Sequence, residues 1–364
     1  MARIILFATT DLVSDQRVHR TALTLHQAGH DVLSVGRRLE NTPKQVEREY
    51  NVKLFRMVFK TGFLFYLFIN LRIFRFLLFH RFDLVCSNDL DTLLGCRLAC
   101  VIRRKPVVYD SHEYFTEVPE LIDRPFTRKI WVTIEKLCLK GVKYSSTVSE
   151  GVANEYLKRY GIKMAVIRNL PFRNEHFGHR AARPTIIYQG ALNKGRGLEL
   201  AIEMIKNLPC YYLIVVGSGD LELKLRKLVI QYNLIDRVEF RGRLPYDKLH
   251  LLTSKSWLGL SLEEDMGLSY HYALPNKLFD YIQAQIVVMV SNLPEMSKIV
   301  KEYGVGIIAE SRDPKKLADQ VATFFEDKNR REKAYDNVNK AYNILVWENE
   351  QSKLLELFDK ALGK

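Results

Sequence analysis

The sequence predicts an α/β protein with two doubly wound parallel sheets, and three observations support this fold class. Short apolar runs rich in β-branched residues alternate with amphipathic stretches of helical spacing along the whole chain. A polar, proline-bearing segment between Pro171 and Pro184 separates a first series of such units from a second. The chain has 364 residues, 47% of them hydrophobic, whereas single cores usually stop growing at roughly 250–300 residues. We therefore predict domains over residues 1–175 and 176–344, followed by a helical segment over 345–364.

Composition indicates a cytosolic protein whose first half binds an acidic partner. The five cysteines include no C-x-x-C pair, and the apolar run from Ile4 to Ala8 is too short for a signal peptide. Residues 1–180 hold 29 Lys and Arg against 18 Asp and Glu, whereas the remainder holds 26 against 24. Nucleic acid, anionic lipid and a phosphate-bearing substrate are all compatible with this imbalance, as is plain solubility.

The first domain opens with a strand, a helix and a second strand. The run from Arg3 to Ala8 is β-like, helical spacing extends from Gln16 to Ala28, and Val32–Val35 begins the next strand. The loop between the first strand and the helix lacks G-x-G-x-x-G, so dinucleotide binding loses its main support. Either Arg17 faces a ligand at the carboxyl end of the sheet, or this is a solvated helix start capped by Asp15.

The stretch from Phe63 to Phe79 is the most unusual in composition. It is aromatic and aliphatic almost throughout, but Arg72 and Arg75 interrupt it. A membrane span needs about 20 mostly apolar residues with few charges. Residues 60–81 therefore form either a helix lying in a membrane interface, with arginines at the headgroups, or a core helix packed on the sheet.

Further short strands are predicted at Leu84–Cys86, Val107–Tyr109 and Ser146–Val148. Asp89 and Asp91 form a D-x-D sequence that leads directly into a helix, so we interpret them as helix-capping residues rather than metal ligands.

A candidate site follows the strand at Val107–Tyr109. The sequence YDSHE places Asp110, His112 and Glu113 on a loop at the carboxyl end of that strand. These groups can hydrogen-bond sugar hydroxyls, and His112 can orient a group or relay a proton. The set is too local to close a metal coordination sphere, so we predict no metal here.

The second domain opens with a strand, a glycine-rich turn and an amphipathic helix over Ile186–Ile205. Such a turn directs backbone N–H groups and the helix dipole at one place, which suits a phosphate. Lys194 and Arg196 add positive charge, although surface cations near glycines are common. A second turn with Gly217 and Gly219 follows the strand Tyr211–Val216, and two such turns in succession indicate a nucleotide site.

Later strands carry further cations. The strand Val238–Phe240 leads to Arg243, and another strand covers Trp257–Leu262. Pro275 and Asn276 are expected to begin a helix with Lys277 in its first turn and Asp280 one turn later. Lys277 is placed to clamp a diphosphate and Asp280 to accept ribose hydroxyls; the alternative is a surface ion pair.

Together these motifs resemble family 4 retaining glycosyltransferases, of the bacterial glycan-biosynthesis type. The resemblance covers nearly the whole chain, through SDQRVHRTALTLHQAGHDV, YDSHE, YQGALNKGRGLEL, VVGSGD, VEFRGRL and LPNKLFDYIQA, in family order. It implies the GT-B fold, two Rossmann-like domains facing across a cleft that holds the donor. It also implies that the last helix, within Trp347–Phe358, crosses back to the first domain.

The resemblance assigns roles to individual positions. Arg196 and Lys277 stand where the donor diphosphate is held, Asp280 stands where a glutamate usually binds the ribose, and His112 stands where a histidine meets the donor sugar. The predicted catalytic residues are His112, Arg196 and Lys277; the predicted donor-binding residues are Gly190, Lys194, Gly195, Gly197, Gly217, Gly219, Arg243, Asn276 and Asp280; the predicted sugar- or acceptor-side residues are Arg17, Asp110 and Glu113.

Three departures from the family pattern stand out. An N-terminal glycine pair is replaced by the loop with Asp15 and Arg17, the arginine after Gly190 is Ala191, and Tyr272 occupies the place of the first glutamate of a paired-glutamate motif. Glu263 or Glu264 is the candidate replacement for that glutamate.

We therefore expect a metal-independent hexosyltransferase without a cofactor that uses a UDP- or GDP-linked sugar. Its expected acceptor is a lipid-linked or membrane-proximal glycan of capsule, exopolysaccharide or lipopolysaccharide type. The expected location is the inner face of the cytoplasmic membrane, through residues 60–81. A nucleotide-sugar epimerase of the same fold is the alternative. A basic nucleic-acid-binding protein is a weaker one, because the sequence contains no recognised reader motif.

Overall fold

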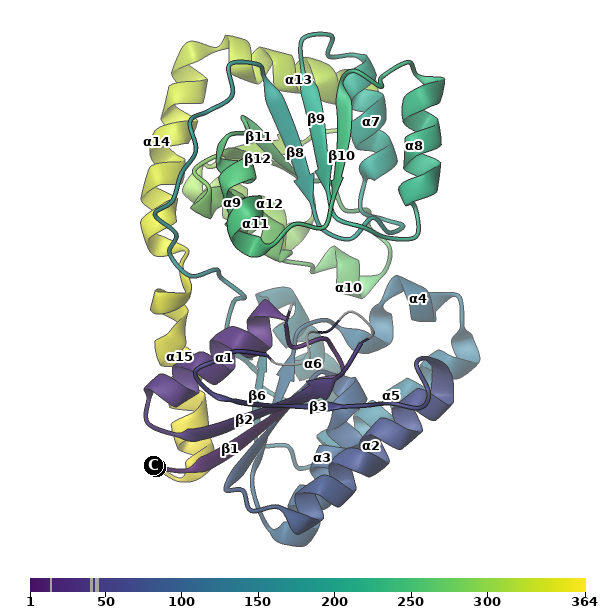
Figure 1. Cartoon of the computed structure of the whole chain (residues 1–364), viewed down its shortest axis with the longest axis vertical. Coiled ribbons are helices and arrows are strands. Elements are labelled where there is room, and N and C mark those ends of the chain that lie inside the picture. The colour runs from purple at the N-terminus through teal and green to yellow at the C-terminus, as the bar shows by residue number, and fades with distance from the viewer. Residues whose placement is uncertain (14, 40–41, 43–45) are drawn as a thin grey trace. The chain divides into compact units, whose positions relative to one another are not determined.

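The computed structural model describes residues 1–13, 15–39, 42 and 46–364, and the chain forms two compact units. The first unit contains Met1–Asn169 together with Glu350–Lys364, and the second contains Leu170–Asn349 (Figure 1). The sequence boundaries at 175 and 344 lie close to these divisions. The final helix, α15 (Trp347–Leu362), begins in the second unit and continues into the first.

The first unit is built on a parallel sheet with strand order β3-β2-β1-β4-β5-β6-β7. Its strands are β1 (Arg3–Phe7), β2 (Asp31–Arg37), β3 (Asn51–Phe55), β4 (Leu84–Asn88), β5 (Val107–Ser111), β6 (Tyr144–Thr147) and β7 (Ala165–Val166). Its helices are α1 (Gln16–Gln27), α2 (Gly62–Phe79), α3 (Leu90–Arg103), α4 (Pro119–Ile122), α5 (Pro125–Leu139) and α6 (Glu150–Tyr160), with a short 3₁₀ turn η1 (Phe115–Glu117).

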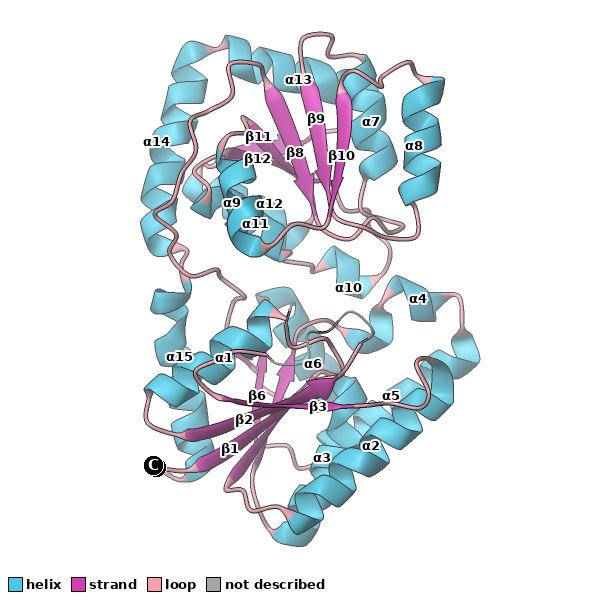
Figure 2. Cartoon of the chain, in the orientation of Figure 1, coloured by secondary structure: helices cyan, strands magenta, loops and turns pink. Residues whose placement is uncertain are grey.

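The second unit is built on another parallel sheet, with strand order β10-β9-β8-β11-β12-β13 (Figure 2). Its strands are β8 (Thr185–Gln189), β9 (Tyr212–Val216), β10 (Val238–Gly242), β11 (Leu258–Ser261), β12 (Val287–Ser291) and β13 (Gly306–Ala309). Its helices are α7 (Leu198–Lys206), α8 (Glu222–Gln231), α9 (Tyr246–Ser254), α10 (Leu268–His271), α11 (Asn276–Gln283), α12 (Pro294–Tyr303), α13 (Pro314–Glu326) and α14 (Lys328–Ile344).

The middle of strand β8, Ile186–Tyr188, is apolar at every position because both faces of its sheet are covered. Side chains alternate between the two faces of a strand, and both faces of this sheet are covered. Ile186 and Tyr188 pack in the core formed with α7 and α13, whereas Ile187 packs in the core formed with α11 and α12. The predicted pair of doubly wound parallel sheets is therefore confirmed.

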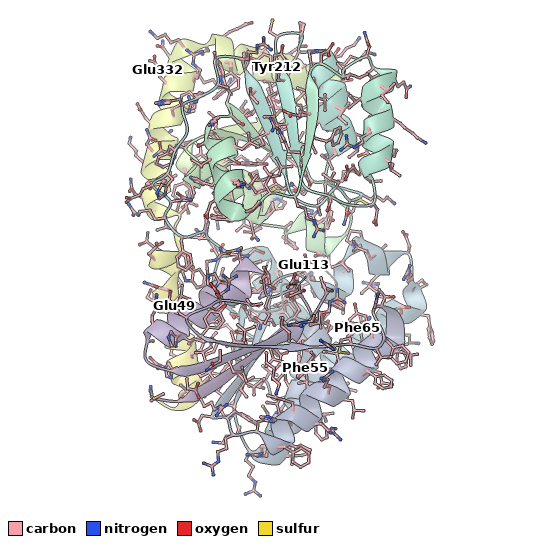
Figure 3. The ribbon with its side chains drawn as sticks, viewed as in Figure 1. Glu49, Phe55, Phe65, Glu113, Tyr212 and Glu332 are labelled. Carbon is pink, nitrogen blue, oxygen red and sulfur yellow. The ribbon has the colours of Figure 1, made fainter. Side chains whose placement is uncertain are left out.

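Helix α2 is apolar on its buried face and on its exposed face. Its sequence is therefore compatible both with a core helix and with a helix lying in a membrane interface. Phe65, Ile69 and Ile73 are buried against the first unit, at the i, i+4, i+8 spacing of one helix face. Phe76 of the same helix packs edge-on against Phe55 of strand β3, with ring centres 5.8 Å apart; Phe55 and Phe65 are labelled in Figure 3. The other face leaves large apolar side chains exposed: Phe63, Leu64, Leu67, Phe68 and Leu71. By length and composition alone α2 also suits a membrane span, yet one face belongs to the core.

Candidate active site

The carboxyl edge of the first sheet holds a buried ionic cluster around Asp110. Arg17 lies in the first turn of α1 and grips both oxygens of Asp110, with Nε 3.0 Å from Oδ2 and Nη2 2.8 Å from Oδ1. Its Nη1 donates to the carbonyl of Ile167 at 2.8 Å. Bidentate pairs of this kind are the stronger form of charged hydrogen bond. The cluster therefore ties α1, β5 and the end of the first unit together.

This geometry corrects the expectations for Arg17 and Asp110. Both side chains are only 2% exposed, so neither faces a ligand directly, and we now assign them a positioning role. Asp15 caps α1 by accepting a hydrogen bond from the backbone N–H of Val18. This confirms the capping part of the second interpretation, but Arg17 is buried, so that part of the helix start is not solvated.

His112 is a partly exposed group of this cluster, with 16% of its side chain accessible, and it lies between two carboxylates. Its Nε2 is 3.1 Å from Asp110 Oδ2 and its Nδ1 is 3.4 Å from Asp89 Oδ2. Burial alone would lower the pKa of His112, but the charges of Asp89 and Asp110 outweigh it and raise the pKa to about 9. The imidazole is therefore a cation at neutral pH, held in a fixed orientation. Glu113, the next residue, is exposed.

The helix-capping interpretation of Asp89 and Asp91 is wrong for both side chains. Asp89 occupies the N-cap position of α3, but its carboxylate makes no capping bond and instead accepts from the backbone N–H of His112 at 2.8 Å. Asp91 accepts from the hydroxyl of Thr9. Burial and the nearby Asp89 raise the pKa of Asp91 to about 7. Both carboxylates accept hydrogen bonds from residues distant in the sequence, His112 and Thr9, rather than from the N–H groups at the start of α3.

The two glycine turns of the second unit interlock at the ends of β8 and β9. Gly190 donates its N–H to Val216, and Gly217 adopts a φ of +140°. A Cβ on Gly217 would stand 1.8 Å from the carbonyl oxygen of Gly190, and one on Gly197 would stand 2.1 Å from that of Leu262. Backbone packing within the unit therefore requires glycine at positions 197 and 217, independently of any ligand.

Arg196 and Lys277 converge on one pocket, as the sequence predicted. The pocket has a volume of about 260 Å³ and is lined by Gly190, Arg196, Asn276, Lys277 and Asp280, with Tyr188, Gln189, Ala191, Leu249 and Pro275. It lies where the strand order reverses between β8 and β11, the place at which open α/β sheets bind their ligands. Of the two cations, Lys277 is only 8% exposed, so it is not part of a surface ion pair.

The buried carboxylate of Glu263 contacts both of these cations. Its Oε1 lies 2.7 Å from Lys277 Nζ and 3.9 Å from Arg196 Nη1, and its Oε2 accepts from the hydroxyl of Ser261 at 2.7 Å. Burial would raise the pKa of this carboxyl, but Lys277 and Arg196 lower it overall, so Glu263 is charged. Of the two candidates, Glu263 contacts the pocket cations but is fully buried and does not line the pocket, while Glu264 contacts Arg312 at 3.4 Å near the surface. The replacement of the family glutamate by either residue stays a prediction.

Asp280 is oriented by a chain of hydrogen bonds that the sequence did not reveal. Gln189 donates from Nε2 to Asp280 Oδ2 at 3.1 Å, and Thr253 donates to Gln189 Oε1 at 2.8 Å. Aromatic rings complete the site: Lys277 Nζ is 4.1 Å from the ring centre of Tyr188. The sequence pattern of β8 does not reveal that Gln189 faces this pocket. Every residue of that strand is buried, so exposed and buried positions do not alternate.

Several predicted donor residues lie outside the pocket lining. Lys194 is exposed, and exposed Arg243 donates from Nε to the hydroxyl of Ser218. Gly195, Gly197 and Gly219 shape the turns without lining the pocket.

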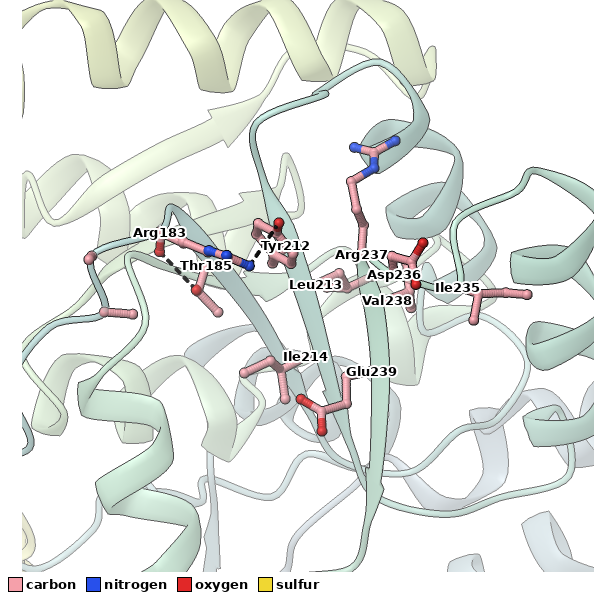
Figure 4. A pocket seen from close by; sticks show the side chains of 12 residues that line it. Arg183, Thr185, Tyr212, Leu213, Ile214, Ile235, Asp236, Arg237, Val238 and Glu239 are labelled. Atoms are coloured by element: carbon pink, nitrogen blue, oxygen red, sulfur yellow. Dashed lines mark hydrogen bonds between the residues drawn. The ribbon is translucent and has the colours of Figure 1, made fainter.

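A second pocket, of about 480 Å³, lies at the amino ends of β8, β9 and β10, where Arg183 donates to Tyr212 (Figure 4). It is at the edge of the sheet opposite the glycine turns, so it is not the predicted nucleotide site.

Two parallel-sheet units, with a cation pocket at the strand reversal of the second, are the arrangement expected of GT-B glycosyltransferases, and the comparison with known proteins identifies this class. The family model for Glycosyltransferase Family 4 matches residues 15–170, and the model for Glycosyl transferases group 1 matches residues 170–341. The chain belongs to the family 4 glycosyltransferases. A comparison with curated proteins returned no match.

Solved structures share the fold over the full length at low identity. Sucrose-phosphate synthase from Thermosynechococcus elongatus has a TM-score of 0.80 at 16% identity, covering all of both chains. HepE from Anabaena, in complex with UDP and glucose, has a TM-score of 0.76 at 14% identity, covering 99% of this chain and 100% of that one. WaaG, a glycosyltransferase involved in lipopolysaccharide biosynthesis, has a TM-score of 0.69 at 12% identity, covering all of both chains. These similarities establish the GT-B fold.

Proposed function

We propose that this glycosyltransferase is a retaining hexosyltransferase that moves a sugar from a UDP- or GDP-linked donor to a lipid-linked or membrane-proximal glycan. The observation that carries the proposal is the convergence of Arg196 and Lys277 on the pocket beside Asp280. The similar fold of HepE, solved with UDP-glucose, supports a nucleotide sugar as the donor.

The proposed mechanism assigns the second unit to the leaving group. As the bond to the sugar breaks, the diphosphate gains charge, and cations fixed around it stabilise that charge where it develops. Glu263 keeps Arg196 and Lys277 in place before the donor arrives, so little reorganisation is needed during the reaction. Asp280 is assigned to the ribose hydroxyls, and the leaving phosphate helps to take the acceptor proton, as the family resemblance implies.

The first unit is assigned to the sugar and acceptor. His112 carries a positive charge between Asp89 and Asp110, which suits it to orient hydroxyl groups rather than to act as a general base. Exposed Glu113 is its neighbour on the acceptor side. The exposed apolar face of α2 and the excess of cations over residues 1–180 support attachment to an anionic membrane. We propose the inner face of the cytoplasmic membrane as its location.

Transfer of labelled sugar tests the proposal. The protein is incubated with UDP- and GDP-linked hexoses and a membrane extract, and label is followed into the lipid phase. Arg196→Ala is expected to reduce the rate by about 10² to 10³, whereas Lys227→Ala, an exposed cation of α8, is expected to leave it unchanged. Absence of transfer, together with absence of thermal protection by any nucleoside diphosphate, would refute the proposal. Isomerised nucleotide sugar formed without acceptor would instead indicate an epimerase.

A further inference from the structure

We propose that an apolar pocket of the first unit binds the hydrocarbon chain of the lipid-linked acceptor. The pocket has a volume of about 910 Å³ and lies among α2, α4 and α5. This inference rests on the proposed function and adds to it the place where the acceptor lipid is held. A volume of this size is at the upper end of small-molecule sites, which are mostly apolar with a few polar groups.

The walls of the pocket are aromatic and aliphatic. Trp131 of α5 packs edge-on against Tyr66 and Phe115, with ring centres 4.9 and 4.8 Å apart. Leu121 and Ile130 add aliphatic surface. An apolar ligand would therefore meet apolar atoms on several sides, which is the condition for strong burial of a hydrocarbon.

The buried amide of Asn70, one of the polar groups that line the pocket, is already hydrogen-bonded within the protein. Asn70 donates from Nδ2 to the carbonyls of Tyr66 and Asp91 at 2.8 and 2.7 Å, and its Oδ1 accepts from the N–H of Gly95 at 2.8 Å. A polar ligand entering this region would lose its hydrogen bonds to water without regaining them from Asn70. The inner pocket therefore favours a chain of methylene or isoprenoid groups over a sugar or a peptide backbone.

The two ends of the pocket identify the occupant as a lipid acceptor. Phe63 and Leu67 line the pocket and also belong to the exposed apolar face of α2, so the pocket opens onto the surface assigned to the membrane. Glu113, labelled in Figure 3, also lines it and directly follows His112. A chain that enters from the α2 face would leave its polar head at the loop that carries His112. Exposed Arg124 in the lining suits a phosphate on that head.

Binding of alkyl phosphates tests this proposal without any sugar transfer. Octyl, decyl and dodecyl phosphate, kept below micelle-forming concentrations, are titrated into the full chain while tryptophan fluorescence is recorded. The chain has three tryptophans, and Trp131 is the one in the pocket wall. We expect saturable quenching that Trp131→Phe abolishes, with affinity rising about fourfold for each added methylene.

Two leucines of α2 give a matched pair of variants. Leu67 lines the pocket and Leu71, one turn later, does not, although their exposed fractions are similar at 48% and 53%. Leu67→Arg is expected to weaken alkyl phosphate binding at least tenfold, and Leu71→Arg is expected to leave it unchanged. Equal loss in both variants would place the chain on the outer face of α2, and affinity independent of chain length would exclude a hydrocarbon occupant; either result overturns the proposal.

The same measurements separate this inference from the proposed function. If label moves from a nucleotide sugar into membrane lipid while alkyl phosphates do not bind, the pocket proposal fails alone. If alkyl phosphates bind as expected while no nucleotide sugar supports transfer, the pocket proposal stands and the proposed reaction fails.

Discussion

Glu263 carries a negative charge at a fully buried position beside two cations, and this arrangement sets the electrostatics of the donor site. A buried carboxylate is tolerated only where partners replace its hydration, and Lys277, Arg196 and Ser261 do so here. Glu263, Arg196 and Lys277 together carry a net charge of +1, so Glu263 does not fully neutralise the two cations, and Asp280 lies beside them in the pocket lining. A diphosphate would then meet cations that are already oriented and not fully neutralised.

Replacing Glu263 tests whether this carboxylate organises the site. We expect Glu263→Gln to lower the free energy of unfolding of the second unit by about 3 kcal/mol, because it leaves Lys277 buried without its counter-charge. Glu264→Gln is the control, since its pair with Arg312 is partly exposed, and the expected change is below about 0.5 kcal/mol. Urea denaturation of both variants measures the difference. Similar stability of the two variants would show that Glu263 does not hold the cations.

The charge on His112 predicts a pH dependence of stability. Its pKa is raised from 6.5 to about 9, so the folded state binds the proton more tightly than the unfolded state. The stabilisation is complete below pH 6.5 and disappears as the pH rises through 9. Wild type should exceed His112→Gln in free energy of unfolding by at most roughly 3 kcal/mol near pH 6, and the gap should narrow by pH 9.5. A gap that does not change over this range would contradict a charged imidazole.

At the scale of elements, the sequence predicted most of the strands, though not β3, β12 or β13, together with the glycine turns and the cation-bearing helix α11, because those signals are local. Apolar runs, helical spacing and glycines are each visible within about ten residues. The partners of Asp110 were not predictable in this way: Arg17 lies 93 residues earlier in the chain. The hydrogen bonds of Gln189 to Asp280 and Thr253 were missed for the same reason.

The interlocked turns at the ends of β8 and β9 predict unequal responses to glycine substitution. We expect Gly217→Ala to destabilise the second unit by at least about 3 kcal/mol, because its Cβ would collide with the carbonyl of Gly190 and its φ is unfavourable. Gly242→Ala also has a positive φ, +63°, but no described atom lies within 4 Å of its Cβ. Its expected cost is only about 1–2 kcal/mol. Denaturation midpoints that rank the two variants equally would contradict the interlocking.

At the scale of the whole molecule, the uneven distribution of charge matters more than its total. Lys and Arg outnumber Asp and Glu by 29 to 18 over residues 1–180, against 26 to 24 in the rest. The excess lies in the same part of the chain as the exposed apolar face of α2. Apolar burial and attraction to anionic headgroups act together at a membrane interface, so this distribution favours attachment through the first unit.

Vesicle binding tests that orientation. The chain should bind vesicles containing anionic lipid, bind neutral vesicles weakly, and lose affinity as salt rises, because screening shortens the reach of the charges. Arg75→Gln removes an exposed cation from α2 and should weaken binding about fivefold, since each basic residue near an anionic surface contributes about 1 kcal/mol. Lys227→Gln changes the net charge equally but lies on α8 of the second unit, so it should have little effect. Equal weakening by both substitutions would mean that net charge alone drives attachment, and the assignment of α2 to the membrane would be wrong.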